Sequence, residues 1–532
     1  MKNKILLSSV SVLFASAIFG ADVNVSGITE STYTFPTEST TLVFDSAKSF
    51  DKVVFSATGD VNNVKVATGV EGTITTVVTP SNVLRPTVII GDSSGNYNGH
   101  INLRFPDYNS SGNVLTSTGS SNVSYPLTIK AVSGTVDLHL SQSAYGNTNI
   151  TVDGNATVYY KNLNNENLYG MWGVNDISVS QGRFNAGQAM IYHGLNISNG
   201  GTLYASGLRL MCEHLKTLSE STIDGNLYLN GSGWGGNQTN YTNSTTGKAY
   251  LERQTALRIG NEQGLKGGKT AEDGAIWNRS QKYTFGSNAN LVQWNSNYKN
   301  AFQATVVVEE GAKLQMQGDL YLEEAAVLKL NASNAFSKIT SVTTKAGDST
   351  TPDVVTVDSR GQKAVDVYIN QMYYRNGVGG YSDVIMEVNA DNDFGTFYFD
   401  ANTNLTLAVA EGKTLSIGGF EQMTNPNNID TAFSINIVSG TMSDTLVLAN
   451  GEYTGVWENN KSFKIYDTAC FDNENITWKL NDVEIEFGKD FVLSAVDGEA
   501  GAYWINQVPE PAEWATIFGA IALGFVAYRR RK

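Results

Sequence analysis

The middle of the sequence is rich in tryptophan and tyrosine, whose flat apolar rings with a polar edge can stack on sugars and contact hydroxyl groups. The residues predicted as sugar contacts are Trp234, Tyr241, Trp277 and Trp294, with Tyr283 and Tyr298 nearby in the sequence. The alternative is that these rings pack the segment onto the rest of the protein, which is the commoner role of tryptophan. The sugar-binding prediction requires at least two exposed rings.

Acidic residues are a second source of candidate chemistry. In NADNDFG, Asn389, Asp391 and Asp393 offer oxygen ligands at the one-three-five spacing of a calcium loop. Phe394 stands where that loop needs glycine, so an acidic turn without an ion is the favoured interpretation. Carboxylates are numerous, but no pair is singled out for glycoside cleavage, for example among Glu309, Glu310, Glu323 and Glu324. We expect no catalytic residue, and calcium is the only candidate cofactor.

Histidine and cysteine are too scarce to predict a metal site. The histidines are His100, His139, His193 and His214, and they show no paired spacing. Cys212 and His214 in MCEHL would share one face of a strand, but a structural zinc needs four ligands. Cys212 and Cys470 are the only cysteines, and the sequence leaves open whether they form one disulfide or two separate thiols.

The charge of the chain excludes two classes of partner. The formal net charge is −15, although only 16% of the 532 residues are charged. An acidic protein of this kind repels nucleic acid and anionic lipid. The hydrophobic fraction of 41% is ample for a folded core, so we expect a folded chain rather than a disordered one.

The elements that would position these residues are short strands. Apolar residues alternate in runs broken by Gly, Asn or Asp, as in DKVVFSATG and ATVVVEEGAKLQMQGDLYL. Alternation with frequent turn residues indicates an all-β fold.

A recurrent turn pattern favours a particular all-β architecture. Glycine lies between two apolar strand residues in ISNGGTL, VEEGAKL and VAEGKTL, at Gly200, Gly311 and Gly412, with looser copies at Gly134 and Gly154. Glycine allows positive φ between strands whose apolar residues point inward. Recurrent rungs of this type predict a parallel β-helix or β-solenoid, and an array of β-sandwiches is the alternative. The body resembles the passenger regions of autotransporter-type surface proteins.

The sequence divides into a signal, a β-rich body and a tail. We expect a β region over 22–126, a solenoid-like body over 127–500 and a linker over 501–507. Within the body, 231–300 is expected to be an elaboration of loops with a helix in KAYLERQTALRIGNEQ.

The first 21 residues have the layout of a secretory signal. Lys2 and Lys4 precede an apolar stretch from Ile5 to Phe19, and small residues follow. This order predicts export through the Sec translocon and removal of the signal by signal peptidase, after Ala17, Gly20 or Ala21.

The last residues predict a single membrane-spanning helix. The uncharged run 514–528 would reach about 22 Å as a helix, which is short against a hydrocarbon core of about 30 Å. Trp514 at one interface and snorkelling arginines at the other would make the span sufficient. The basic end, Arg529, Arg530, Arg531 and Lys532, would stay in the cytoplasm, which leaves the body outside.

The same tail resembles a known sorting signal. Val508, Pro509, Glu510 and Pro511, then the apolar run and the terminal basic cluster, are similar to the PEP-CTERM signal of exported proteins of Gram-negative bacteria. The resemblance covers about the last 25 residues, 508–532. It implies recognition by a membrane-embedded exosortase, removal of the tail, and delivery of the body to the cell surface or extracellular matrix. The alternative is an ordinary anchor that is retained.

These observations lead to an expectation about function. We expect an exported cell-envelope or matrix protein with a structural or adhesive role, no catalytic activity, and polysaccharide as a candidate partner. The alternative is a surface polysaccharide lyase or glycoside hydrolase on a β-helix, which rests on analogy of fold alone. Converging carboxylates beside Arg or Lys in a groove would favour the enzyme.

Overall fold

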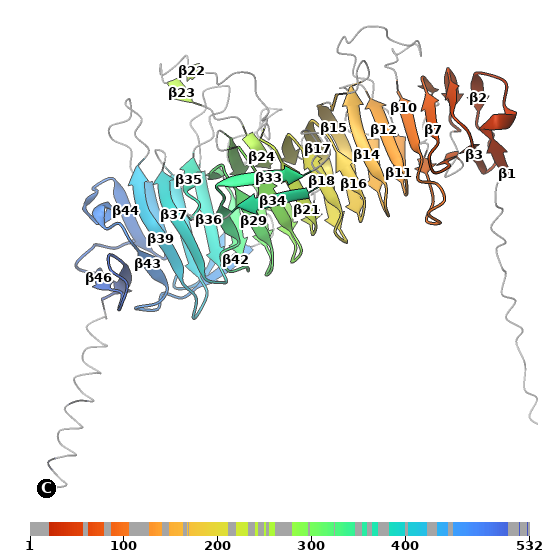
Figure 1. Cartoon of the computed structure of the whole chain (residues 1–532). Coiled ribbons are helices and arrows are strands. Elements are labelled where there is room, and N and C mark those ends of the chain that lie inside the picture. The colour runs from red at the N-terminus through yellow and green to blue at the C-terminus, as the bar shows by residue number, and fades with distance from the viewer. Residues whose placement is uncertain are drawn as a thin grey trace, which may run out of the picture.

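A computed structural model gives the fold of the chain (Figure 1). The structure describes residues 21–56, 62–78, 87–105, 127–140, 148–162, 167–168, 170–210, 220–231, 240–242, 249–251, 255–260, 279–295, 298–323, 325–345, 354–358, 364–370, 382–399, 403–422, 433–444, 451–508, 521 and 529. The described part is all-β, as the sequence predicts, and its strands stack into an elongated body.

Most strands belong to three parallel ladders, which we name A, B and C. In ladder A, each strand pairs with the next one named here: β1 (Ala21–Asn24), β3 (Thr40–Phe44), β6 (Asn62–Val66), β9 (Thr87–Ile90), β11 (Leu127–Ala131), β13 (Thr148–Val152), β15 (Met171–Ser180), β17 (Gln188–Ser198), β20 (Glu220–Ile223), β25 (Lys282–Phe285), β28 (Thr305–Val308), β31 (Val327–Leu330), β36 (Ser382–Val388), β38 (Thr403–Val409), β40 (Phe433–Ile437) and β44 (Ile476–Leu480).

Ladder B branches from ladder A at the long strand β17. Residues Gln188–Ile191 of this strand pair with β19, whereas Asn196 and Ile197 pair with β20. Ladder B then continues through β19 (Gly207–Leu210), β24 (Thr255–Ile259), β27 (Lys299–Phe302), β30 (Leu320–Glu323), β35 (Val367–Asn370), β37 (Asn392–Phe399), β39 (Leu415–Gln422) and β43 (Phe463–Ile465).

Ladder C forms a separate sheet that ends before the other two. It contains β4 (Lys48–Phe50), β7 (Glu71–Ile74), β10 (His100–Arg104), β12 (Thr135–Leu140), β14 (Thr157–Asn162), β16 (Arg183–Asn185), β18 (Thr202–Ala205), β21 (Asn226–Leu229), β26 (Asn290–Gln293), β29 (Lys313–Met316) and β32 (Phe336–Lys338). A short parallel sheet accompanies the N-terminal strands, with β2 (Thr32–Thr34), β5 (Lys52–Val54) and β8 (Val77–Val78). Beyond β32, ladders A and B continue among the described residues.

Alternation places one set of side chains in a continuous core. In β10, Ile101 and Leu103 are fully buried, whereas His100, Asn102 and Arg104 point outward. Phe302 of ladder B lies 6.5 Å from Phe285 of ladder A and 6.4 Å from Phe336 of ladder C, measured between ring centroids. The three ladders therefore enclose one core, and each buried aromatic ring contributes about 1.5–3 kcal/mol of burial free energy. This arrangement is consistent with a β-helix.

The turn glycines have the backbone conformation that the sequence predicts. Gly200, Gly311 and Gly412 have φ of 77°, 95° and 74°, and Gly134 and Gly154 have φ of 79° and 54°. The apolar residues on either side of each of the first three turns are buried. Side chains other than hydrogen strain this conformation, which is why glycine recurs there.

The predicted helix is wrong where the structure describes it. Residues Ala249–Leu251 form β23, which pairs with β22 (Asn240–Thr242), and Thr255–Ile259 form β24 of ladder B. Apolar residues in this stretch fit strand alternation, and pairing with the ladder outweighs local helix propensity. The N-terminal strands β3, β6 and β9 belong to ladder A, so the sheets run continuously from region 22–126 into the body.

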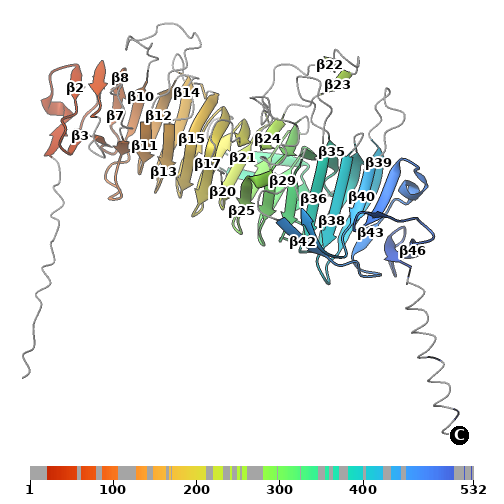
Figure 2. The same ribbon diagram turned by 180° about the vertical axis from the view of Figure 1, so that it is seen from behind.

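The C-terminal end closes with antiparallel strands, unlike the ladders. β47 (Tyr503–Gln507) pairs antiparallel with β43 and β46 (Phe491–Ala495), and β45 (Val483–Glu484) pairs antiparallel with β44. We name residues 463–508 the C-terminal cap; it also holds the 3-10 helix η2 (Ala469–Asp472) and lies at one end of the body (Figure 2). Another 3-10 helix, η1 (Val25–Gly27), lies beside β1.

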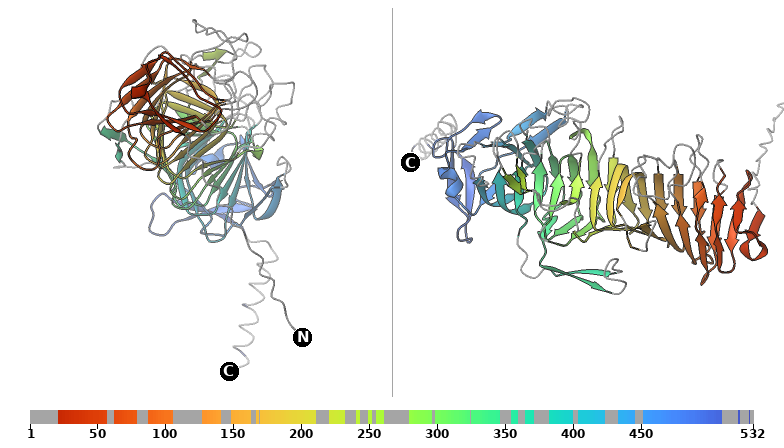
Figure 3. Two further views of the ribbon diagram at one scale, coloured as in Figure 1. Left: turned by 90° about the vertical axis from the view of Figure 1, so that its right-hand side faces the viewer. Right: turned by 90° about the horizontal axis from the view of Figure 1, so that it is seen from above.

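Two further hairpins leave the ladders. The hairpin of β33 (Ser341–Lys345) and β34 (Val354–Asp358) extends away from the body (Figure 3). The hairpin of β41 (Gly440–Asp444) and β42 (Gly451–Gly455) contacts β36 and β38. No helix within the described residues is long and apolar enough to cross a membrane.

Candidate functional site

The aromatic residues predicted to bind sugar have different outcomes. Trp234 and Trp277 lie outside the described residues. Tyr241 lies on β22, where the structure describes its backbone but not its side chain. The ring of Trp294 is half-buried, with its centroid 6.3 Å from that of Tyr204 on β18. Tyr283 is buried on β25, so it packs rather than offering a face to a ligand.

The predicted sorting motif is described only at its first residue. The Val508 amide donates a hydrogen bond of 2.9 Å to the Asp490 carbonyl, which fixes the start of the tail to the C-terminal cap. Pro509, Glu510 and Pro511 lie outside the described residues, as do Arg530, Arg531 and Lys532, whereas Arg529 is described and exposed.

The acidic turn at 389–393 binds its neighbours in the stack. Asp391 Oδ1 accepts a hydrogen bond of 2.8 Å from the Thr414 amide, and the Asp393 amide donates one of 2.9 Å to Asn334 Oδ1. Asn389 Nδ2 donates to Asn331 Oδ1 at 2.9 Å. Where the chain is described, no group of three or more His, Cys, Asp or Glu side chains could hold a metal ion.

Cys470 is a free thiol in the C-terminal cap. Burial raises its pKa to about 12, and the nearby Asp467 carboxylate acts in the same direction. Cys470 therefore forms no disulfide with any residue that the structure describes. Cys212 and His214 lie outside the described residues.

The outer face of ladder B carries a tyrosine column that the sequence analysis missed. Tyr321, Tyr368 and Tyr398 occupy the same register position on β30, β35 and β37. Their rings stack at centroid distances of 4.5 Å and 4.8 Å, with interplanar angles of 6° and 19°. These distances match the spacing of paired strands, so the ladder itself sets the stack. We name these residues the tyrosine column.

Stacking decides which part of each ring is available to a ligand. The faces of Tyr368 lie against the two neighbouring tyrosines, and Lys299 Nζ lies 5.1 Å from the Tyr321 ring centroid. Glu421 follows Tyr398 in register on β39. Burial, and then the charges of Glu421 and Asp366, raise the pKa of Tyr398. The column therefore stabilises the ladder, and its inner faces are closed to sugar stacking.

A buried charged group lies beside the tyrosine column. Glu323 is fully buried, and its carboxylate accepts hydrogen bonds from Lys299 Nζ at 2.7 Å and Gln303 Nε2 at 2.9 Å. Arg258 Nη1 lies 3.8 Å from Glu323 Oε2. Burial alone would raise the pKa of Glu323, but the charges of Lys299 and Arg258 outweigh burial and hold it below its usual range. The carboxylate is fixed between two cations, so it is poorly suited to exchange protons as a general acid or base.

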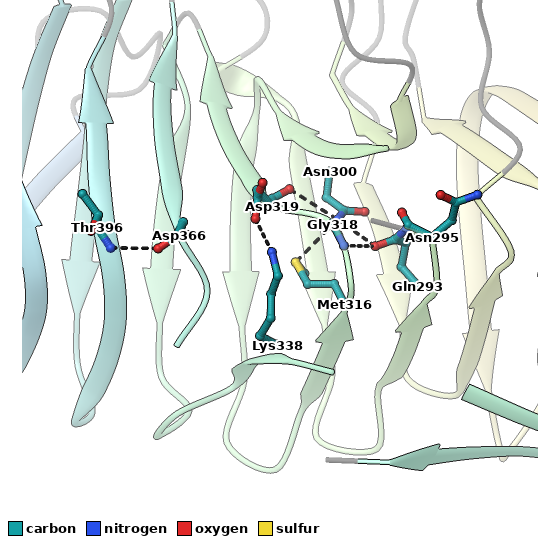
Figure 4. A network of polar contacts seen from close by, with 9 residues as sticks. All are labelled: Gln293, Asn295, Asn300, Met316, Gly318, Asp319, Lys338, Asp366 and Thr396. Atoms are coloured by element: carbon teal, nitrogen blue, oxygen red, sulfur yellow. Dashed lines mark hydrogen bonds and ion pairs between the residues drawn. The ribbon is translucent and has the colours of Figure 1, made fainter. Parts of the chain in front are cut away.

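Polar side chains at the corner of ladders B and C are also engaged with one another (Figure 4). Gln293 Oε1 accepts hydrogen bonds from the Gly318 amide at 2.9 Å and from Asn300 Nδ2 at 3.3 Å. Lys338 pairs with Asp319, and Asp366 Oδ1 accepts a hydrogen bond of 2.9 Å from the Thr396 amide. Two of these contacts satisfy backbone amides, those of Gly318 and Thr396, and the other two join side chains.

A third polar group lies on the outer face of ladder C. Asp137 Oδ2 lies 2.7 Å from Lys161 Nζ and 3.0 Å from His100 Nε2. Burial opposes ionisation of Asp137, but His100 and Lys161 hold its pKa below the usual value. In return, the Asp137 carboxylate beside the ring raises the pKa of His100. Strand pairing brings together residues that the sequence separates by tens of positions.

The sequence contains a signal for the tyrosine column that alternation alone did not reveal. The segments DLYLE, DVYIN and TFYFD place tyrosine between two core residues at positions 319–323, 366–370 and 396–400. Loops of unequal length separate them, which hides the repeat from a search for a fixed period. The chain matches no family model, no curated protein and no solved structure.

Proposed function

We propose that this chain is an exported parallel β-solenoid that serves a structural or adhesive role in the bacterial cell envelope or matrix. Its tail spans the inner membrane, is recognised by an exosortase and directs the body to the surface. Sugar contact by the aromatic residues of segment 231–300 would supply the adhesive chemistry.

One observation carries the structural part of this proposal. In the tyrosine column, the Glu323 group and the Asp137 group, the outward side chains bind the outward side chains of neighbouring strands. Contacts of this kind stiffen an elongated stack of strands, because each strand is fixed to the next through its outer face as well as through the core. A catalytic groove would instead keep its carboxylates open to a substrate.

The sorting part is supported by the order of motif, apolar run and basic end. We expect replacement of Pro509, Glu510 and Pro511 by alanine to leave full-length protein in the membrane fraction of a host with the exosortase. Immunoblots of membrane, surface and medium fractions give the measurement. A control that replaces Glu310 by Gln, in an exposed turn outside the motif and the C-terminal cap, should be processed normally. Unchanged processing of the alanine variant would contradict the sorting proposal.

The non-enzymatic part is tested by activity on polysaccharides. The fragment 22–507 is incubated with a panel of acidic and neutral polysaccharides, and new reducing ends and unsaturated products are measured. We expect no turnover. Turnover of any of these polysaccharides by the fragment would replace this proposal by a polysaccharide lyase or hydrolase.

A further inference from the structure

Where the body is described, its large exposed apolar side chains belong to the C-terminal cap. Among the described residues ahead of the tail, the large exposed hydrophobic ones are Tyr466, Val483, Phe487 and Val492, with exposed fractions of 43, 68, 44 and 37%. The Tyr466 hydroxyl donates a hydrogen bond of 2.6 Å to Glu499 Oε1, so its polar end is satisfied within the cap. Val483, Phe487 and Val492 have no polar group to satisfy, and Phe487 stays 44% exposed although its ring packs against Phe471 and Phe491. Single exposed apolar residues are normal on a protein surface, whereas several on one face mark an interaction surface.

Two of these residues lie beside the point where the tail leaves the cap. Val492 pairs with Asn506, and Phe491 pairs with Gln507, in the antiparallel register of β46 and β47. The Val508 amide then donates to the Asp490 carbonyl, so this hydrogen bond carries the strand pairing one residue further. Phe487 stacks on Phe471 with ring centroids 4.9 Å apart, which holds it at the same end.

The length of the intervening chain limits how far the cap can lie from a membrane. Six residue steps separate Val508 from Trp514, where the apolar run begins. At about 3.5 Å per step, this segment spans at most about 21 Å, even when fully extended. The headgroup layer takes up about 5–8 Å of that distance. A cap tethered this closely lies on or next to the headgroups.

The charges around the apolar residues indicate which lipids fit. Glu484, Glu486 and Asp490 are acidic, and Lys489 is the basic residue among them. Acidic groups are repelled by anionic headgroups, and the repulsion extends over about a Debye length. The surface therefore fits zwitterionic headgroups.

We propose that, while the tail spans the membrane, the C-terminal cap docks on zwitterionic lipid through Val483, Phe487 and Val492. This inference rests on the proposed membrane span of the tail. Docking would hold the sorting motif at the membrane surface and set the direction in which the body leaves it.

The test uses the full chain in phosphatidylcholine vesicles with an environment-sensitive fluorophore at Val483→Cys or Phe487→Cys. Cys212→Ser is the background, and buried Cys470, with its pKa raised to about 12, does not compete for the label at neutral pH. We expect a blue-shifted emission and quenching by lipids that carry a nitroxide in the headgroup region. The control label at Thr222→Cys, exposed on β20, should stay water-like.

Two further arms make the result decisive. Twelve Gly and Ser residues inserted between Val508 and Pro509 should weaken the quenching at Val483 several-fold while the chain still floats with the vesicles. Phosphatidylglycerol in the vesicles should also weaken quenching at low salt.

A chain that floats but keeps a water-like label overturns the docking inference alone. A chain that does not float overturns the membrane span, and docking with it. Quenching that appears only in native membranes would assign the residues to a protein partner and overturn lipid docking.

Discussion

At the scale of single residues, buried charges on the outer faces of the ladders are paired across neighbouring strands. Glu323 illustrates the cost of such a position, because its carboxylate has no contact with water. Lys299 Nζ and Gln303 Nε2 replace the lost hydration through hydrogen bonds. The Glu323–Lys299 ion pair adds little net free energy to folding, because desolvation of the two charges opposes their Coulomb attraction. Loss of one partner would nevertheless be costly, because it would leave the other charge buried and unpaired.

We expect Glu323→Ala to lower the free energy of unfolding by about 3–5 kcal/mol, because it leaves Lys299 buried without its carboxylate. The depressed pKa of Glu323 adds a pH dependence. Its stabilising contribution is present above its unfolded-state pKa of about 4.3 and is lost as the pH falls through the lower folded-state value. Urea unfolding followed by circular dichroism at pH 7 and pH 3 gives the measurement.

The matched control for this prediction is Glu310→Ala, because Glu310 is exposed in the turn beside Gly311. Its effect should stay within about 0.5 kcal/mol, as for other surface substitutions. Equal destabilisation by the two variants would show that Glu323 is not held by the contacts described above.

His100 gives a pH dependence of the opposite sign. Its pKa is raised in the folded state by the Asp137 carboxylate, which lies 3.0 Å from His100 Nε2. The charged ring therefore stabilises the fold below its unfolded-state pKa of about 6.5, and this contribution is lost as the pH rises through the folded-state value. We expect His100→Gln to lower the free energy of unfolding by about 1 kcal/mol at pH 5.5, a modest amount because the ring is partly exposed. The loss should be smaller at pH 8.5, because the ring is then uncharged. Thermal unfolding at both pH values checks this, and a larger loss at pH 8.5 would contradict it.

At the scale of elements, the tyrosine column shows that parallel pairing places the same type of side chain in register on successive strands. Tyr368 has a stacked neighbour on each side, whereas Tyr321 and Tyr398 each have one tyrosine neighbour in the column. Each aromatic contact contributes about 0.5–1.5 kcal/mol beyond area burial. The middle ring therefore holds β30, β35 and β37 together from the outside.

We expect Tyr368→Ala to lower the free energy of unfolding by about 1–3 kcal/mol, because it removes both stacking contacts. The control Tyr368→Phe keeps the ring and should be nearly neutral. Thermal unfolding measures both variants. If the phenylalanine variant is as unstable as the alanine variant, the hydroxyl rather than the stack is what matters.

The strands and turns could be predicted from local sequence, but the sites could not. Alternation of apolar residues predicts strands and their buried face, and the glycines at 200, 311 and 412 predict turns with positive φ. These features depend only on residues that are close together in the sequence. Which strands pair depends on loop lengths. Tyr321, Tyr368 and Tyr398, or His100 and Asp137, become neighbours only through register, and alternation does not encode register between distant strands. The helix predicted over 248–263 failed for the same reason, since Thr255–Ile259 is a strand only because ladder B pairs with it.

At the scale of the whole molecule, stacking creates an end that must be closed. A parallel ladder ends in unpaired backbone groups, which can template pairing with another chain. The antiparallel strand β47 covers β43 at the C-terminal end. Trp457 Nε1 donates a hydrogen bond of 2.9 Å to the Ile505 carbonyl, which fixes this strand to the core.

We expect Ile505→Asp to open the C-terminal cap and cause association of the body. Ile505 is 3% exposed, so the new carboxylate would be buried without a partner and would detach β47 from β43. The unpaired edge of ladder B would then be free to pair with another copy. The matched control is Val492→Asp, because Val492 lies on the same hairpin and is 37% exposed. Light scattering after size-exclusion chromatography of the 22–507 fragment should show concentration-dependent oligomers for Ile505→Asp and a species like the unsubstituted fragment for Val492→Asp. If Ile505→Asp behaves like Val492→Asp, closure of this end does not depend on β47.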